Sequence, residues 1–129
     1  MFDSIPIFIS GLITGMIIFQ TSVIAPSVFK TLSEEGAGPF LRSIFPKLFL
    51  IILVLGAFQA ILSIIQASIT LTVVGFITFT SMLISYLIVP ATNKARDEND
   101  QESFKRLHLI SVILTVIVLL TNILFIFVN

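Results

Sequence analysis

Side chains that can bind ions or polar ligands are concentrated between Pro90 and His108 of this 129-residue chain. The segment holds four of the seven basic residues and the only histidine. Arginine presents a planar fork that suits carboxylate and phosphate groups, and histidine titrates near neutral pH. We therefore consider that Arg96, Lys105 and Arg106 form a site for a lipid headgroup or an anionic ligand. The simpler interpretation is a solvated connection with local capping.

The composition around this segment is that of a membrane protein. Hydrophobic residues make up 57% of the chain and charged residues 11%, whereas a soluble domain carries about 25% charged residues. A chain this short cannot build a core large enough to cover such long apolar runs. The net charge is zero and there is no cysteine, which argues against a nucleic-acid partner and excludes disulfides and thiolate metal sites. We predict a single membrane domain over residues 1–129.

Four apolar stretches are long enough for membrane spans, each of which needs about 20 residues. We expect spans over about 5–29, 45–67, 69–89 and 104–128, with loops over 30–44 and 90–103. The run from Leu48 to Val89 carries no charge and is about twice too long for one span, so we expect a tight turn around residues 66–68. The predicted fold class is all-α: a polytopic membrane protein with a bundle of four transmembrane helices.

The basic residues predict the orientation of the bundle. All seven lie in or beside the two expected loops, at Lys30, Arg42, Lys47, Lys94, Arg96, Lys105 and Arg106. In a four-span protein these loops share one side, and the positive-inside rule places that side in the cytoplasm. We expect both termini outside, in a bacterial inner (plasma) membrane, with the lipid bilayer as the main partner.

Three amide side chains fall inside the expected spans: Gln20, Gln59 and Asn122. They either line a polar cavity and present amides to a ligand, or pair across helices and pack the bundle. Gly11 and Gly15 form a weak close-packing motif that could support a homo-oligomer. No charged residue lies near a span centre, which argues against ion-coupled transport through a charged relay.

The order of the spans predicts one ligand site. The second and fourth spans begin, and the third ends, on the charged side, so their end residues can converge there. The expected ligand-binding residues are Pro46, Asn93, Arg96, His108 and Ser111.

The preferred function is a non-enzymatic membrane protein that binds or transports a small molecule or lipid, or assembles with a membrane partner. No serine comes with both a base and an orienting carboxylate in plausible geometry, so a serine hydrolase is not supported. The alternative is a haem-binding membrane oxidoreductase with His108 as axial ligand. One histidine without cysteine cannot form a structural zinc site, so we predict no metal site and no cofactor other than haem in that alternative.

Several short motifs resemble one family. They are Phe45-Pro46 at the start of the second span, the proline-to-arginine segment Pro90–Arg96, and Phe104, His108 and Ser111 in the fourth span. In this combination the chain resembles the domain-of-unknown-function 4149 family, typified by transmembrane protein 205. The resemblance covers nearly the whole chain. Leu109 stands where that family typically has a glycine. The resemblance implies a four-helix integral membrane protein and supplies no biochemical activity.

Overall fold

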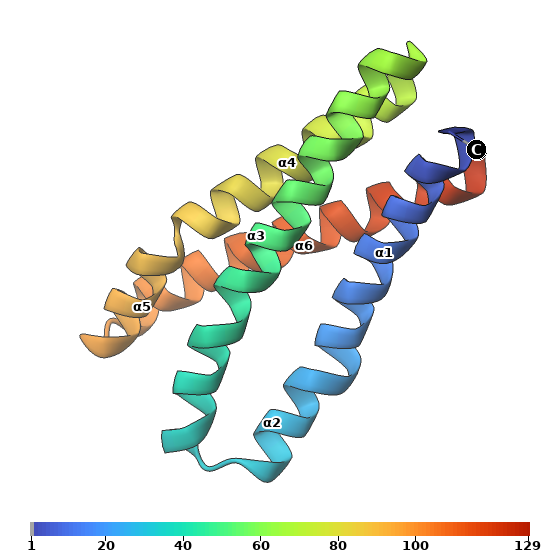
Figure 1. The fold of residues 1–129 in the computed structure, drawn as a ribbon. Coiled ribbons are helices and arrows are strands. Elements are labelled where there is room, and N and C mark those ends of the chain that lie inside the picture. The colour runs from blue at the N-terminus through green and yellow to red at the C-terminus, as the bar shows by residue number, and fades with distance from the viewer. Residues whose placement is uncertain (1) are drawn as a thin grey trace.

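In a computed structural model, which describes residues 2–129, the chain is almost entirely helical. Its elements in order are the 3₁₀ turn η1 (Phe2–Ser4), α1 (Ile5–Phe19), the π-helical turn η2 (Gln20–Ile24), α2 (Ala25–Thr31), α3 (Glu34–Gln66), α4 (Ile69–Leu87), α5 (Val89–Asp97) and α6 (Gln101–Val128). The segments from η1 to α2 form one rod and α5 continues α4, which gives four long helices (Figure 1). All four are long and apolar enough to cross a membrane. The predicted all-α bundle of an integral membrane protein is confirmed.

The helices extend further than the sequence predicts. Loops are expected over 30–44 and 90–103, whereas α3 already begins at Glu34, and α5 and the start of α6 occupy most of the second segment. Most of both segments is helical, and their place outside the membrane stays a prediction. A helix of 33 residues is about 50 Å long, which exceeds the hydrocarbon thickness of about 30 Å. The charged first turns of α3 can therefore be helical and still lie outside the hydrocarbon layer of a membrane.

The prolines account for this difference. Pro39 and Pro46 lie inside α3, where each removes only one backbone hydrogen bond and the rest of the long helix persists. Pro90 lies in the first turn of α5, where a missing N–H has no cost because that group has no helical partner anyway. Pro90 therefore starts a new helix directly after α4 instead of opening a loop.

The first rod passes Pro26 through the π-helical turn η2. Proline has no N–H to donate, and just before it the N–H of Ala25 donates to the carbonyl of Gln20, five residues back. The hydroxyl of Thr21 donates to the carbonyl of Ile17 at 2.9 Å. These bonds satisfy backbone groups locally, so the rod continues through Pro26 as α2.

Helices α3 and α4 are in backbone contact. A Cβ atom added to Gly75 would lie 2.7 Å from the backbone nitrogen of Ala60, and one added to Gly56 would lie 2.8 Å from Cγ2 of Thr78. Small residues permit this approach, which is the main way that helices associate in lipid. The two helices are joined at the predicted turn, where Ala67 adopts φ 50°.

The predicted Gly11 and Gly15 motif does not pack inside the chain. A Cβ atom added to either residue meets nothing within 4 Å. The motif therefore faces outward on α1, and its use in a homo-oligomer stays a prediction.

One hydrogen-bonded cluster joins all four long helices. Nε2 of Gln59 on α3 donates to Oγ of Ser10 on α1 at 2.9 Å and to Oδ1 of Asn122 on α6 at 3.0 Å. Nδ2 of Asn122 donates to Oγ1 of Thr78 on α4 at 3.0 Å and to the carbonyl of Val118 at 2.9 Å. The four side chains from the four rods are fully buried. Gln59 and Asn122 thus pair across helices.

The third predicted amide lies apart from this cluster. Gln20 is buried, but within residues 2–129 its Nε2 atom has no hydrogen-bond partner. Of the three amides, the structure therefore joins only Gln59 and Asn122.

We predict that Asn122→Leu lowers the free energy of unfolding by about 1–3 kcal/mol, because it leaves Gln59 and Thr78 without their shared partner. Thr121→Val is the control, since the Thr121 hydroxyl bonds only to Ile117 O on its own helix. The measurement is the midpoint of unfolding in detergent micelles titrated with sodium dodecyl sulfate. Equal midpoints for the two variants would contradict the importance of the cluster.

Candidate functional site

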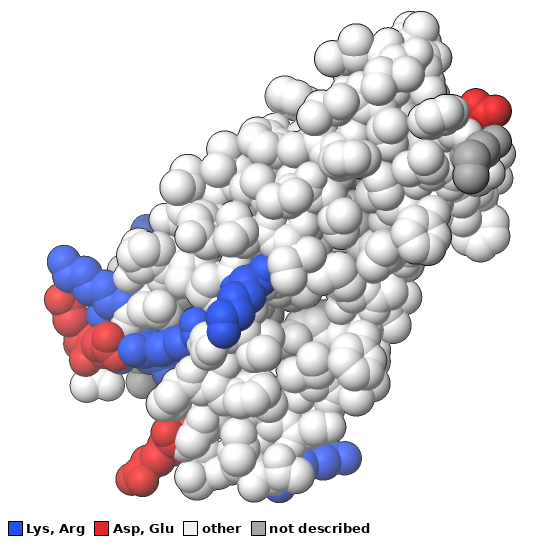
Figure 2. Space-filling model, viewed as in Figure 1, with Lys and Arg blue, Asp and Glu red and all other residues white. Residues whose placement is uncertain are grey.

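The charged residues gather at one end of the bundle. Figure 2 shows the blue and red side chains together where α2 ends, α3 and α6 begin and α5 lies, while the rest of the visible face is white apart from one acidic residue at the far end. All seven Lys and Arg residues belong to these segments. The bundle therefore has one polar end and a long apolar body.

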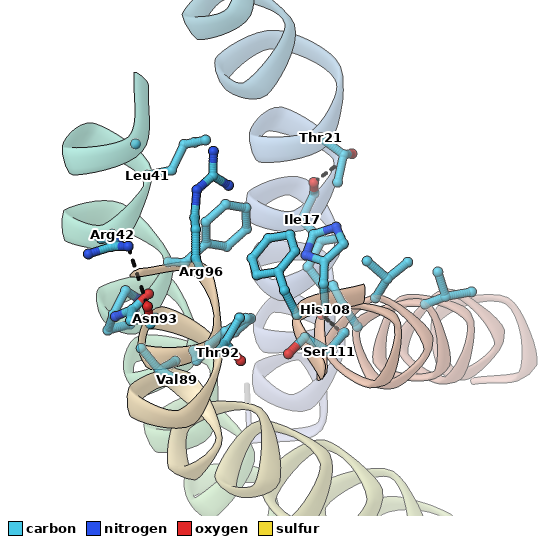
Figure 3. A pocket seen from close by; sticks show the side chains of 18 of the residues that line it. Ile17, Thr21, Leu41, Arg42, Val89, Thr92, Asn93, Arg96, His108 and Ser111 are labelled. Atoms are coloured by element: carbon cyan, nitrogen blue, oxygen red, sulfur yellow. Dashed lines mark hydrogen bonds between the residues drawn. The ribbon is translucent and has the colours of Figure 1, made fainter. Parts of the chain in front are cut away.

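A cavity of about 460 Å³ opens at this end between α1, α3, α5 and α6. Its lining includes the five residues predicted as a ligand site, namely Pro46, Asn93, Arg96, His108 and Ser111. Figure 3 shows Asn93 and Arg96 on one side of the cavity and His108 and Ser111 on the other, with Thr21 of the first rod beside them. The predicted convergence of these residues is thus present in the structure.

The inner walls of the cavity are apolar. Aromatic and aliphatic side chains form most of them: Ile17, Leu41, Phe45, Phe49, Val89, Val112, Val116 and Leu119. The threonine hydroxyls in the lining donate to carbonyls one turn back on their own helices, from Thr21, Thr92 and Thr115. Because these hydroxyls are already satisfied, the inner part of the cavity suits hydrocarbon rather than polar groups.

The first long helix, from η1 to α2, also contributes to this cavity, which is not predicted from the sequence. Ile17 and Thr21 both line it, and both belong to the stretch around the π-helical turn. Such turns are frequent at functional sites. Pro26, which follows the turn, is the signal in the sequence that could have pointed there.

A cation and two aromatic rings form a stack at the mouth. Cζ of Arg96 lies 5.3 Å from the ring centroid of Phe104. The rings of Phe104 and His108 are nearly parallel, at 6°, with centroids 5.7 Å apart. A guanidinium over an aromatic face is held by the electrons of the ring. The stack therefore connects α5 to α6 and fixes Arg96 beside the cavity.

The other arginine at the mouth is engaged by a carboxylate. Nη2 of Arg42 lies 2.6 Å from Oδ1 of Asp97, and Nη1 lies 3.3 Å from Oδ2, so the pair is bidentate. Nη2 also approaches the carbonyl of Asn93 at 3.5 Å. The pair is partly exposed to solvent, so we expect it to contribute little stability. Its effect is to join α3 to α5 and to neutralise Arg42.

A second cavity, of about 480 Å³, adjoins the first. It shares Arg96 and Phe104 with the first cavity, and its other lining residues are Glu34, Ala95, Asn99, Asp100, Gln101 and Lys105. Asp100 caps α6 by accepting the N–H of Ser103 at 3.2 Å, and the hydrogen bonds from Ser103 hold the pKa of Asp100 below its usual value. An apolar cavity and a polar one thus meet at Arg96.

His108 is the one histidine available to a haem group. One ring face of His108 is covered by Phe104. Among residues 2–129, no three His, Cys, Asp or Glu side chains cluster closely enough to hold a metal ion. The haem alternative remains a prediction that neither observation tests.

A family model described as Domain of unknown function (DUF4149) matches residues 8–101. The match contains Pro46, Asn93 and Arg96, while His108 and Ser111 lie after it. Neither a curated protein nor a solved structure matches the chain. The resemblance to this family is confirmed, and the link with transmembrane protein 205 stays a prediction.

Proposed function

We propose that this chain, which belongs to the DUF4149 family, binds a small apolar or amphiphilic molecule, such as a lipid, within the membrane. The observation that carries the proposal is the cavity of about 460 Å³, with apolar walls and a cationic, aromatic mouth. Ligand cavities in proteins measure about 300–1,000 Å³ and combine apolar walls with a few placed polar groups. The cavity fits this description.

Because the cavity belongs to a membrane protein, its ligands compete with the surrounding lipid. A lipid tail already lies in hydrocarbon, so its transfer to an apolar cavity gains little from the hydrophobic effect. Selection must then come from the shape of the walls and from the polar groups at the mouth. A molecule with a tail and one polar end uses both features.

Binding is better supported than catalysis by the side chains of the site. His108 and Ser111 both line the cavity, but the hydrogen bonds within residues 2–129 include none between them. A serine nucleophile needs a base within hydrogen-bond reach and a third group that orients the base. These residues can contact a ligand without transforming it.

We also propose that the mouth of the cavity faces the cytoplasm of a bacterial inner membrane. Support comes from the seven Lys and Arg residues, all of which belong to the segments at one end of the bundle. Basic residues beside spans are retained on the cytoplasmic side.

The absence of cysteine gives a direct test of this orientation. In intact bacterial cells, we expect an impermeant maleimide to label Asn129→Cys, at the C-terminus, but not Glu98→Cys, between α5 and α6. Glu98→Cys should react only after the membrane is opened. The reverse pattern, or labelling of both variants in intact cells, would contradict the proposed orientation.

We predict that Val116→Trp abolishes binding of the neutral fluorescent probe N-phenyl-1-naphthylamine, because the indole fills the cavity between α3 and α6. Leu120→Trp is the matched control, since Leu120 lies on the same helix, about one turn further along, and outside the lining. The measurement is probe fluorescence against protein concentration in neutral detergent. Unchanged binding by Val116→Trp would show that the probe binds elsewhere and would refute the cavity as the binding site.

A further inference from the structure

We propose that Arg96 is the anion-binding group of this cavity, and that the preferred ligand is an amphiphile that carries a carboxylate or phosphate group. The inference rests on the proposed function, because it requires that the cavity binds an amphiphile at all. It adds the chemical class of the ligand and assigns its recognition to one side chain.

The two arginines at the mouth differ in what they contact. Arg42 is neutralised by the bidentate pair with Asp97, in which Nη2 and Oδ1 are 2.6 Å apart. Arg96 makes neither an ion pair nor a side-chain hydrogen bond within residues 2–129, and contacts the ring of Phe104 instead. Both arginines line the cavity, and Asp97 interacts electrostatically with both. Of the two, only Arg42 has its N–H donors occupied by a carboxylate within residues 2–129, so those of Arg96 are available to a ligand.

The contact with Phe104 orients this charge without consuming its donors. The ring attracts the charge of the guanidinium, with Cζ 5.3 Å from the ring centroid, and does not need the five N–H donors as hydrogen-bond donors. These donors match the two oxygens of a carboxylate or phosphate group. The rings of Phe104 and His108 are stacked, so they support the guanidinium from α6.

The arrangement of the two cavities places the two ends of the ligand. Arg96 and Phe104 border both cavities, so an anionic group at Arg96 lies where the apolar cavity meets the polar one. The tail can then follow α6 past Val112 and Val116, which line only the apolar cavity. The remainder of a headgroup would extend into the polar cavity.

The charges that line the polar cavity limit the negative charge that a headgroup can carry. Its lining carries the carboxylates of Glu34 and Asp100 as well as the ammonium group of Lys105. The carboxylates repel a headgroup with several negative charges. A single carboxylate or phosphate group at Arg96 is therefore preferred over a headgroup that carries several phosphate groups.

The test compares ligands that differ only in the polar end. Dodecanoate, dodecyl phosphate and dodecanol displace N-phenyl-1-naphthylamine from the purified full chain in neutral detergent at pH 8, and inorganic phosphate is added in a separate arm. We expect the two anionic amphiphiles to bind about tenfold more tightly than dodecanol, the lower range for a hydrogen bond to a charged group. Arg96→Gln should remove this preference, so that dodecanoate, dodecyl phosphate and dodecanol bind with similar affinity.

Two further variants keep the test conclusive. Lys94→Gln should retain the preference for the anionic amphiphiles, because Lys94 lies on the same helix, α5, but outside the lining of both cavities. Arg96→Lys should retain part of it, because the charge is preserved while the fork is lost. An equal loss in Lys94→Gln and Arg96→Gln would overturn the assignment to Arg96.

The outcomes separate the inference from the proposed function. Equal binding of dodecanoate and dodecanol by the unmodified chain would overturn the inference and leave amphiphile binding in place. Failure of every amphiphile and of the probe to bind would overturn the proposed function itself. Displacement of dodecyl phosphate by millimolar inorganic phosphate would indicate a site for the free ion and would overturn the preference for an amphiphile.

Discussion

The hydrogen-bonded cluster of Ser10, Gln59, Thr78 and Asn122 is the constraint on which the rest of the bundle depends. Each side chain comes from a different rod and each is fully buried. In hydrocarbon no water replaces a lost partner, so the four rods have a defined position and rotation at this level. The close contact of α3 and α4 at Gly75 lies in the same half of the molecule.

The cavity exists because this constraint does not extend to the charged end. Leu119, the last lining residue on α6, precedes Asn122 by about one helical turn. Beyond the cluster, α2 and the start of α3 are joined by a short connection (Figure 1) but make few contacts with each other. Side chains of α5 border the mouth of this apolar space, since α5 contacts α3 through Arg42 and α6 through Arg96. The ion pair of Arg42 and Asp97 connects α3 to α5, and Arg96 brings a positive charge to the mouth of the cavity.

Much of this architecture follows from the sequence, because long apolar runs and the placement of charges determine the number of helices and which ends share a side. We therefore expect Pro46, Arg96 and His108 at one end of the bundle, and the structure places them around one cavity. The apolar runs and the charges do not determine the rotation of each helix about its axis. Whether the amides of Gln59 and Asn122 pair with each other or face a ligand depends on that rotation. The contribution of Ile17 and Thr21 to the cavity lining depends on it as well. The persistence of α3 through Pro39 and Pro46 depends on the stability of the whole helix rather than on either residue.

The most direct test of this account is photo-crosslinking with a diazirine-labelled fatty acid, followed by mass spectrometry of the labelled peptides. The diazirine is placed midway along the chain, and the full-length protein is labelled in neutral detergent. The account predicts labels on the cavity-facing residues of α3 and α6, such as Phe45 and Val116, that excess dodecanoate removes. Labels confined to outward-facing residues such as Phe8 and Phe76, which are 68% and 66% exposed, with no competition by dodecanoate, would contradict it.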